Sequence, residues 1–329
     1  MSDEQGSGET PSQDVSVFLD ADVKDDVVVP FQAEKAGARG RLLRLGDTVN
    51  EILSAHDYPD GVANFLGEAI ALAAMVGSLL KFDGKLILQT KTDGPISMLV
   101  VDFSTPSSLR AYASFDKARV GELEGEPYDL QTWLGQGVLA LTIDQGPDME
   151  RYQGIVALDK TSLGEVAEAY FAQSEQIPSL VRLHVAKHFS SEQDDGTGWH
   201  WRAGGLMVQH LTAKGGLGGE QADVHDDDLE DENWNRAKIL GSSVEPHELL
   251  DPQLAPERLL FRLYHEEGVR VFDPFGLDAT CSCSEERVRA MLGKFSPTHR
   301  QDMIDQGGKI SVTCEFCTKR YEFDLEDFV

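Results

Sequence analysis

The sequence predicts an α+β fold built in three parts. Segments rich in β-forming residues, several of them hairpin-like, alternate with helical segments over the first two thirds of the chain, which is typical of a largely antiparallel sheet packed on helices. A glycine-rich and then acidic stretch interrupts this pattern, and all four cysteines lie in the last fifth of the chain. We therefore expect an N-terminal domain with a largely antiparallel sheet and a buried helix, a helical linker, and a small C-terminal cysteine domain.

The N-terminal domain is predicted over residues 14–213, after a disordered tail at residues 1–13. Runs of β-branched and aromatic residues mark its strands. The expected strands are 27–31, 40–45, 85–92, 96–103, 109–114, 138–144, 153–158, 181–189 and 199–211. The sequence Asp93-Gly94-Pro95 separates the third strand from the fourth and predicts the turn of a β-hairpin.

Three helices are expected in this domain. The first begins at Asp47 and ends before Pro59. The second, at 63–80, is nearly all apolar and rich in alanine and glycine. A helix that is apolar on all sides is predicted to lie buried in the main core. The third, at 162–173, carries an apolar face and a polar face.

A linker is predicted over residues 214–274. It opens with a glycine-rich break at 214–219, and residues 220–232 then carry eight acidic side chains and no Lys or Arg. Such a composition is typical of a solvated acidic segment. A helical stretch is expected to begin at Trp234, and prolines divide the rest of the linker into short helices. Apolar and charged residues alternate closely here, so we expect this part to pack loosely on either neighbouring domain.

The charge of the chain limits its partners. The chain carries 57 acidic and 29 basic side chains, a formal net charge of -28. Such a surface repels phosphate backbones, so we expect no nucleic-acid partner. The first residues show neither the basic region nor the apolar region of a targeting signal, and the apolar run 69–80 is too short to cross a membrane. We therefore expect a cytoplasmic protein without a membrane partner.

The cysteines form two close pairs, Cys281-x-Cys283 and Cys314-x-x-Cys317, separated by thirty residues. Four soft thiolates complete the tetrahedral coordination of Zn²⁺. Two close pairs that frame a short domain therefore predict one zinc ion per chain, bound in the reduced form. His299 could replace a thiolate, but with four cysteines available we expect it on the surface of a helix.

The C-terminal domain, predicted over residues 275–329, has little besides a metal to hold it together. Ser284 and Ser296 are expected to cap two short helices, and Tyr321 and Phe323 anchor a small core. A structural zinc site supplies about 10 to 16 kcal/mol of apparent binding free energy, whereas a core this small supplies only a few kcal/mol. Loss of the metal is therefore expected to unfold the domain.

Each cysteine pair is also a potential disulfide. Two residues apart on an extended chain, Cys281 and Cys283 have Cα atoms about 6 to 7 Å apart, near the upper limit for a disulfide. A strained disulfide of this kind tends to be labile or regulatory. Cys314 and Cys317 can also pair with each other, so oxidation would remove all four metal ligands together.

Unfolding of the cysteine domain is a way in which an oxidant could expose an apolar surface. We expect the linker to pack beside that domain. When the domain unfolds, the linker loses a neighbour and exposes Trp234, Leu249, Leu260 and Phe261.

Several motifs occur in one order along the chain: RGRLLRLG at 39–46, LLKFDGK at 79–85, IDQGPDM at 143–149, WRAGG at 201–205, and then the two cysteine pairs. Together they make the chain resemble the bacterial redox-regulated heat-shock chaperones, the 33 kDa chaperonin family. The resemblance covers nearly the whole chain. The chain departs from the family pattern in its acidic N-terminal tail, its acidic loop at 190–198 and its more acidic linker.

The resemblance implies an ATP-independent holdase, which is not an enzyme. It implies a protein that is zinc-bound and inactive when reduced, and that binds unfolding client proteins when oxidised. It further implies disulfides between Cys281 and Cys283 and between Cys314 and Cys317, zinc release, and a homodimer in the oxidised form. The sequence agrees on ATP, because it contains no G-x-x-x-x-G-K-[ST] phosphate-binding loop.

Two other functions compete with this one. A thiol-disulfide oxidoreductase would use Cys314 or Cys317, but the motif lacks the strand-to-helix context of a thioredoxin fold. A nucleic-acid-binding zinc ribbon would use the basic residues around Arg320, but neighbouring carboxylates cancel their charge. For other chemistry, His184 and His188 are expected to be ordinary strand residues.

The pair of carboxylates at Asp144 and Asp148 is also expected to be structural. These residues flank Gly146-Pro147, and an aspartate that caps a turn accounts for them.

Overall fold

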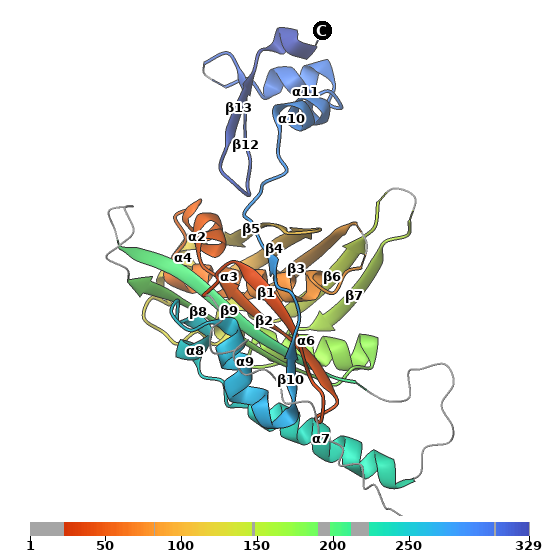
Figure 1. Cartoon of the computed structure of the whole chain (residues 1–329). Helices are drawn as coiled ribbons and strands as arrows, with labels where there is room; N and C mark the ends of the chain where they lie inside the picture. The colour runs from red at the N-terminus through yellow and green to blue at the C-terminus, as the bar shows by residue number, and fades with distance from the viewer. Residues whose placement is uncertain are drawn as a thin grey trace, which may run out of the picture.

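The structure is a computed structural model (Figure 1). It describes residues 23–81, 83–146, 149–189, 198–211, 224–305 and 307–328. The predicted tail at 1–13, the glycine-rich break at 214–219 and all but the last residue of the loop at 190–198 lie outside the described residues.

Two antiparallel sheets form most of the N-terminal domain. The first has the order β10-β1-β2-β9-β8, with β11 also paired to β1, and the second has the order β5-β4-β3-β6-β7. The strands of the first sheet are β1 (Val27–Ala33), β2 (Ala38–Leu45), β8 (Ser179–Phe189), β9 (Trp199–His210), β10 (Val269–Val271) and β11 (Phe275–Gly276). The strands of the second are β3 (Lys85–Thr92), β4 (Ile96–Ser104), β5 (Ser108–Phe115), β6 (Gly137–Asp144) and β7 (Tyr152–Ala157). Each of the predicted strands overlaps one of β1 to β9, which confirms the α+β prediction.

The helices follow the predicted order, with additions. Those of the N-terminal domain are α2 (Asp47–Ser54), α3 (Asp60–Gly77), α4 (Lys117–Gly121), α5 (Leu130–Leu134), α6 (Leu163–Tyr170) and the π-helical turn η1 (Phe171–Glu175). The linker contains α7 (Val224–Ser242), α8 (Pro246–Leu250), α9 (Pro256–Tyr264) and η3 (His265–Glu267). The sequence did not indicate α4 or α5. It also placed the first linker helix too late, because α7 begins inside the acidic run.

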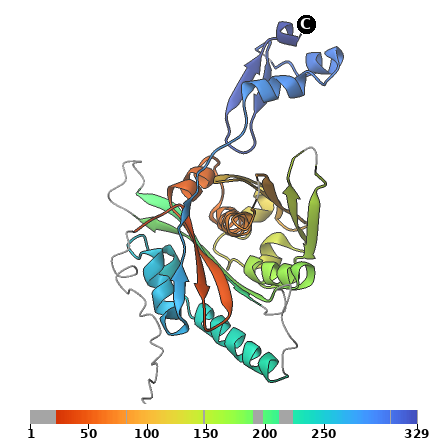
Figure 2. The ribbon, with the colours of Figure 1, turned by 45° about the vertical axis from the view of Figure 1, so that its right-hand side comes forward.

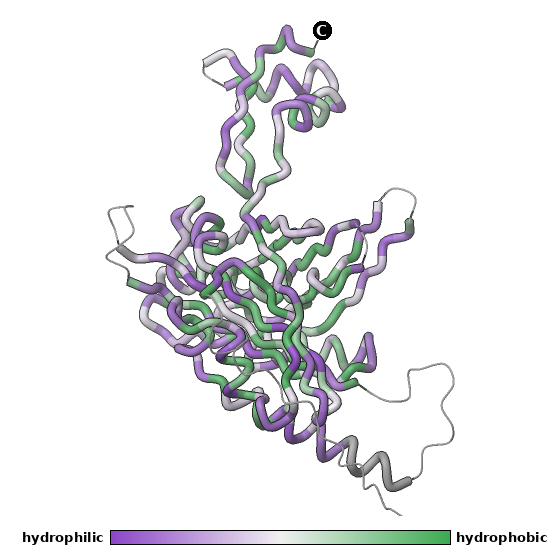
Figure 3. The backbone as a smooth tube through the Cα atoms, in the orientation of Figure 1, coloured by the Kyte–Doolittle hydropathy of each residue, from purple (hydrophilic) through white to green (hydrophobic). Residues whose placement is uncertain are grey.

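Helix α3 forms the centre of the N-terminal domain. Figure 2 shows it nearly end-on, enclosed between the two sheets. Its side chains from Val62 to Met75 are almost all removed from solvent. They join one apolar cluster with residues of both sheets and of α6, and Figure 3 shows hydrophobic residues concentrated in this region. The predicted burial of this apolar helix is confirmed.

Helix α3 is long and apolar enough to cross a membrane by length and composition alone. It is longer than the apolar run 69–80 that the sequence suggested. However, 89% of it is buried inside the protein. A core helix enclosed by two sheets has this character, because every side of it meets apolar side chains.

The linker helices cover the opposite face of the first sheet. Trp234, Leu249, Leu260 and Tyr264 are buried in a second apolar cluster, whose other members come from β1, β2, β8, β9, β10 and the linker itself. The C-terminal cysteine domain lies at the other end of the molecule (Figure 1). The expectations that the linker packs loosely and beside the cysteine domain are therefore wrong, since the N-terminal sheet buries its apolar residues.

Two arginines fasten the linker to this sheet. Arg44 of β2 is fully buried and donates to the carbonyl oxygens of Glu248 and Asp251, with 2.8 Å to the former. Arg202 of β9 donates from Nε to the carbonyl oxygen of Leu250 at 2.8 Å. These carbonyls end α8 and lack partners within the helix. The arginines therefore satisfy the C-terminal end of α8 and fix its position.

The cysteine domain is small. It contains α10 (Glu285–Leu292), α11 (Pro297–Asp302), η4 (Leu325–Phe328) and the hairpin of β12 (Ile310–Thr313) and β13 (Arg320–Phe323). Ser284 and Ser296 cap the two α-helices, as predicted. Four buried side chains form its core, namely Leu292, Ile310, Tyr321 and Phe323. Because β10 and β11 pair with β1, the segment that leads into this domain belongs to the first sheet of the N-terminal domain.

Replacement of a buried linker side chain should destabilise the N-terminal domain. Leu260→Ala removes a fully buried side chain of α9 and is expected to lower the free energy of unfolding by about 2 to 5 kcal/mol, because a cavity remains. Urea unfolding of the zinc-loaded chain measures this loss. Ile239→Ala, on the linker helix α7 but 69% exposed, serves as the control. Equal midpoints for the two variants would contradict the packing described.

Candidate metal centre

Two short segments bring the four cysteines together. Cys281 and Cys283 lie in the extended stretch between β11 and α10, while Cys314 and Cys317 lie in the turn between β12 and β13. This turn is tight. Cys314 N–H donates to the Lys319 carbonyl at 2.9 Å, and Thr318 N–H donates to the Cys314 carbonyl at 2.9 Å. The backbone therefore holds the two sulfurs of the second pair on one side of the hairpin end.

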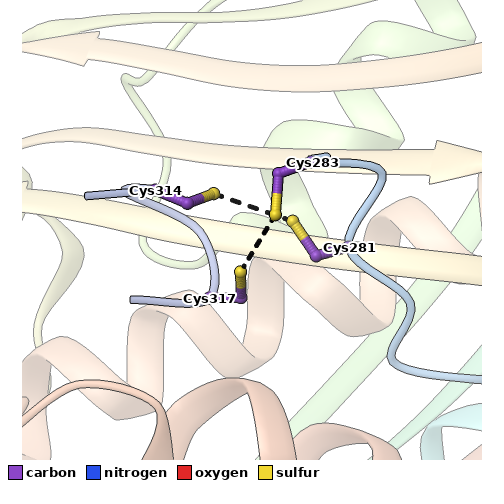
Figure 4. A group of neighbouring side chains, drawn as sticks. All are labelled: Cys281, Cys283, Cys314 and Cys317. Atoms are coloured by element: carbon purple, nitrogen blue, oxygen red, sulfur yellow. Dashed lines mark hydrogen bonds between the residues drawn. The ribbon is translucent and has the colours of Figure 1, made fainter. Parts of the chain in front are cut away.

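The four sulfur atoms form a compact cluster (Figure 4). All of them lie within 4.8 Å of one another. The Sγ atoms of Cys281 and Cys314 are 3.7 Å apart, and those of Cys283 and Cys317 are 3.4 Å apart. Tetrahedral zinc with four Zn–S bonds of about 2.3 Å needs sulfurs about 3.8 Å apart. The cluster therefore has the donor type and the spacing of a four-coordinate metal site.

The cluster has a hydrogen-bond donor of its own. The Tyr321 hydroxyl donates to the Cys283 Sγ at 3.1 Å. Burial raises the pKa of the Cys281 thiol and raises that of Cys317 to about 12. Burial acts in the same direction on Cys283, but the hydrogen bonds from Tyr321 and the neighbouring thiols outweigh it and lower the pKa of this thiol to about 7. Burial thus disfavours the thiolate form at Cys281 and Cys317, and a bound cation would offset that cost.

The other candidate residues from the sequence analysis lie in helices, strands and turns away from the sulfur cluster. His299 is exposed on α11, as expected. His184 and His188 lie on β8. The Asp144 carboxylate accepts a hydrogen bond from the Gly146 N–H at 3.0 Å, so it caps a turn as predicted, and Asp148 lies outside the described residues.

The oxidoreductase arrangement is not found at the second cysteine pair. Cys314 and Cys317 lie between two strands of a hairpin, whereas a thioredoxin-like motif stands at the start of a helix that follows a strand. The sequence identified all four cysteines but assigned Tyr321 only to the small core. Its position four residues after Cys317 gave no sign that its hydroxyl contacts Cys283.

Comparisons with known proteins agree with this fold. The family model described as Hsp33 protein matches residues 26–324. The 33 kDa chaperonin of Caulobacter vibrioides (strain NA1000 / CB15N) is 44% identical over 308 residues, which are 93% of this chain and 97% of that protein. The 33 kDa chaperonin of Ectopseudomonas mendocina (strain ymp) is 37% identical over 298 residues, with 90% and 92% coverage.

A solved structure shares the fold. The crystal structure of the 33 kDa chaperonin, a heat shock protein 33 homolog, from Thermotoga maritima aligns with a TM-score of 0.72. The alignment covers 92% of this chain and 96% of that one at 23% identity. The family match over most of the length, together with the two close relatives, confirms the resemblance noted in the sequence. This chain belongs to the Hsp33 family of 33 kDa chaperonins.

Proposed function

We propose that this chaperone is an ATP-independent holdase controlled by the redox state of its four cysteines. The observation that supports the proposal most directly is the sulfur cluster. Four sulfurs within 4.8 Å come from two pairs, and each pair is close in sequence. The same cluster can therefore serve as a metal site when reduced and as two disulfides when oxidised.

In the reduced state, Cys281, Cys283, Cys314 and Cys317 are proposed to bind one Zn²⁺. Four thiolate donors favour zinc over magnesium or calcium, which prefer oxygen ligands. The ion would supply most of the stability of a domain whose core has four buried residues. A completed tetrahedral site has no free coordination position, so it is structural and not catalytic.

In the oxidised state, the disulfides are proposed to form within pairs, between Cys281 and Cys283 and between Cys314 and Cys317. Two thiolates of a pair lose one electron each and form one S–S bond. Hydrogen peroxide accepts both electrons and, with two protons, leaves as two water molecules. Two such steps remove all four ligands, and the zinc ion is released to the solvent.

The unfolding of the cysteine domain would affect the rest of the chain through the segment from β10 to Cys281. This segment pairs with β1, and β1 also packs against the linker helices. Unfolding of the cysteine domain removes the anchor at one end of the segment. Its release would weaken the cover on the first sheet and expose the apolar linker residues to client proteins.

Unfolded or partly unfolded proteins are the proposed clients, and a homodimer is proposed for the oxidised form. The clients would bind to the exposed apolar surface of the chaperone, and this binding requires no nucleotide. The acidic surface, with a net charge of -28, keeps the loaded chaperone soluble. A cytoplasmic location is part of the proposal, since cysteines there stay reduced until an oxidant appears.

Peroxide should convert the reduced protein in a fixed stoichiometry. We expect one zinc ion to be lost as four thiols disappear, measured together with a zinc indicator and a thiol reagent. Light scattering of a thermally unfolding client should then fall, and a dithiol reductant with added zinc should reverse both changes. Retention of zinc after loss of the thiols, or unchanged scattering with the oxidised protein, would contradict the proposal.

Loss of the Tyr321 hydroxyl should weaken zinc binding without loss of a ligand. Tyr321→Phe removes the hydrogen bond to Cys283, and groups that orient metal ligands typically contribute 10- to 100-fold in affinity. Competition with a chelator under reducing conditions measures this change. Tyr152→Phe, at an exposed tyrosine of β7, is the control and should leave zinc affinity unchanged. An unaltered affinity in Tyr321→Phe would refute the role of this hydroxyl.

A further inference from the structure

The cysteine domain meets the N-terminal domain at the edge strand β5 and near helix α2. A cleft of about 380 Å³ lies between them, lined by Glu51 and Ser54 of α2, Arg110 of β5, and Cys281, Phe316 and Cys317. The turn between β12 and β13 points toward β5 in Figure 1. The cleft therefore borders two of the four sulfurs and the aromatic residue between Cys314 and Cys317.

Arg110 lies at the centre of this contact. Its guanidinium carbon is 4.0 Å from the centre of the Phe316 ring, and Arg110 lines the same cleft as Cys281. A guanidinium above an aromatic face is attracted by the ring quadrupole. One arginine of the N-terminal domain thus contacts the ring within the second cysteine pair, in a cleft that also borders Cys281 of the first pair.

Arg110 is itself held by the N-terminal domain. Its Nε donates to the Asp102 Oδ2 at 2.8 Å, and the two residues lie directly opposite each other on β5 and β4. The Asp102 side chain is only 9% exposed. The ion pair is therefore well shielded, so Arg110 should remain on β5 when its contacts with the cysteine domain break.

The backbone supports the same contact. Leu109 N–H donates to the Asp278 carbonyl at 2.8 Å, and Asp278 N–H donates to the Ser107 carbonyl at 3.1 Å. The Ser108 hydroxyl donates to the Thr280 carbonyl at 3.0 Å. The chain is thus bound to the edge of β5 up to the residue before Cys281. This arrangement fixes where the first sulfur enters the cluster.

We propose that Arg110 is the positioning residue that docks the cysteine domain on β5 and stabilises its metal-bound form. The inference rests on the proposed function. Four thiolates around Zn²⁺ carry a net charge of minus two, which a neighbouring guanidinium partly neutralises. Disulfide sulfurs carry no charge, and a disulfide between Cys314 and Cys317 changes the turn that presents Phe316. Oxidation therefore removes the negative charge near Arg110, displaces the Phe316 ring and undocks the domain.

The test uses the full-length, reduced, zinc-loaded chain and two independent measurements. Zinc release to a chelator reports the stability of the site. Hydrogen exchange at the amides of Leu109 and Asp278 reports docking, because these amides bond across the contact. Phe316→Leu removes the ring and leaves the N-terminal domain untouched. Arg110→Met removes the cation, and Arg110→Lys keeps the charge but loses the planar stacking group.

Phe316→Leu and Arg110→Met are each expected to accelerate zinc release about five- to tenfold, as the loss of one partly desolvated cation–π contact implies. Exchange at both amides should rise in parallel, and Arg110→Lys should fall between wild type and Arg110→Met. The double variant should be no worse than the more affected single variant, because both changes remove one shared interaction. Phe295→Leu and Arg151→Met, at exposed positions in the two domains, should match wild type.

The inference is overturned if Phe316→Leu releases zinc and exchanges these amides at the rates of the control variants. It is also overturned if the effects of the two single variants multiply in the double variant, since the residues then act independently. A reduced chain without zinc, or an oxidised chain that fails to protect clients, counts against the proposed function. Docking is still judged in that case by amide exchange, which requires no ion.

Discussion

The C-terminal end of this chaperone depends on one constraint, namely that four sulfurs must share a space less than 5 Å across. Sulfurs this close cannot all be ionised unless a cation compensates their repulsion. Among its described residues, the domain around them buries four apolar side chains in its core, so a metal bound by the sulfurs would be inseparable from the fold. In the proposed function, a chemical change at the sulfurs is therefore also a structural change in the domain.

The position of the linker determines how the proposed loss of the cysteine domain can affect the apolar linker residues. The buried apolar residues of α7 to α9 pack against the first sheet, and Arg44 and Arg202 hold the terminal carbonyls of α8. The cysteine domain does not shield these side chains directly. In the proposed function, the effect of oxidation passes instead along residues 269–281, which pair first with β1 and then with the edge of β5.

Local patterns in the sequence predicted most of the fold. The strands β1 to β9 follow from runs of β-branched and aromatic residues, and α3 follows from its uniformly apolar composition. Strands β10 and β11 are three and two residues long, too short for any periodicity. The clustering of the four cysteines could also be predicted, because the spacing of the two pairs is typical of a metal site.

Contacts between residues far apart in the sequence could not be predicted from such local patterns. Arg44 meets Glu248, and Arg110 meets Phe316, across some two hundred residues. Nothing local in the sequence distinguishes these arginines from solvated ones. The family resemblance, in contrast, rested on segments with long-range contacts. The motif at 201–205 contains Arg202, and it also contains Gly204, where an added Cβ would lie 2.5 Å from the Leu249 carbonyl oxygen. The motif at 39–46 contains Arg44.

The pairing of β10 with β1 also sets the order in which the protein can be completed during synthesis. Phe31 is one of the first residues of the fold to leave the ribosome, and its partner Val271 is among the last of the N-terminal domain. Until then, the outer edge of β1 has no partner strand, and unpaired edges invite association with other chains. A nascent copy of this chaperone thus passes through a period in which it is itself an incompletely folded protein.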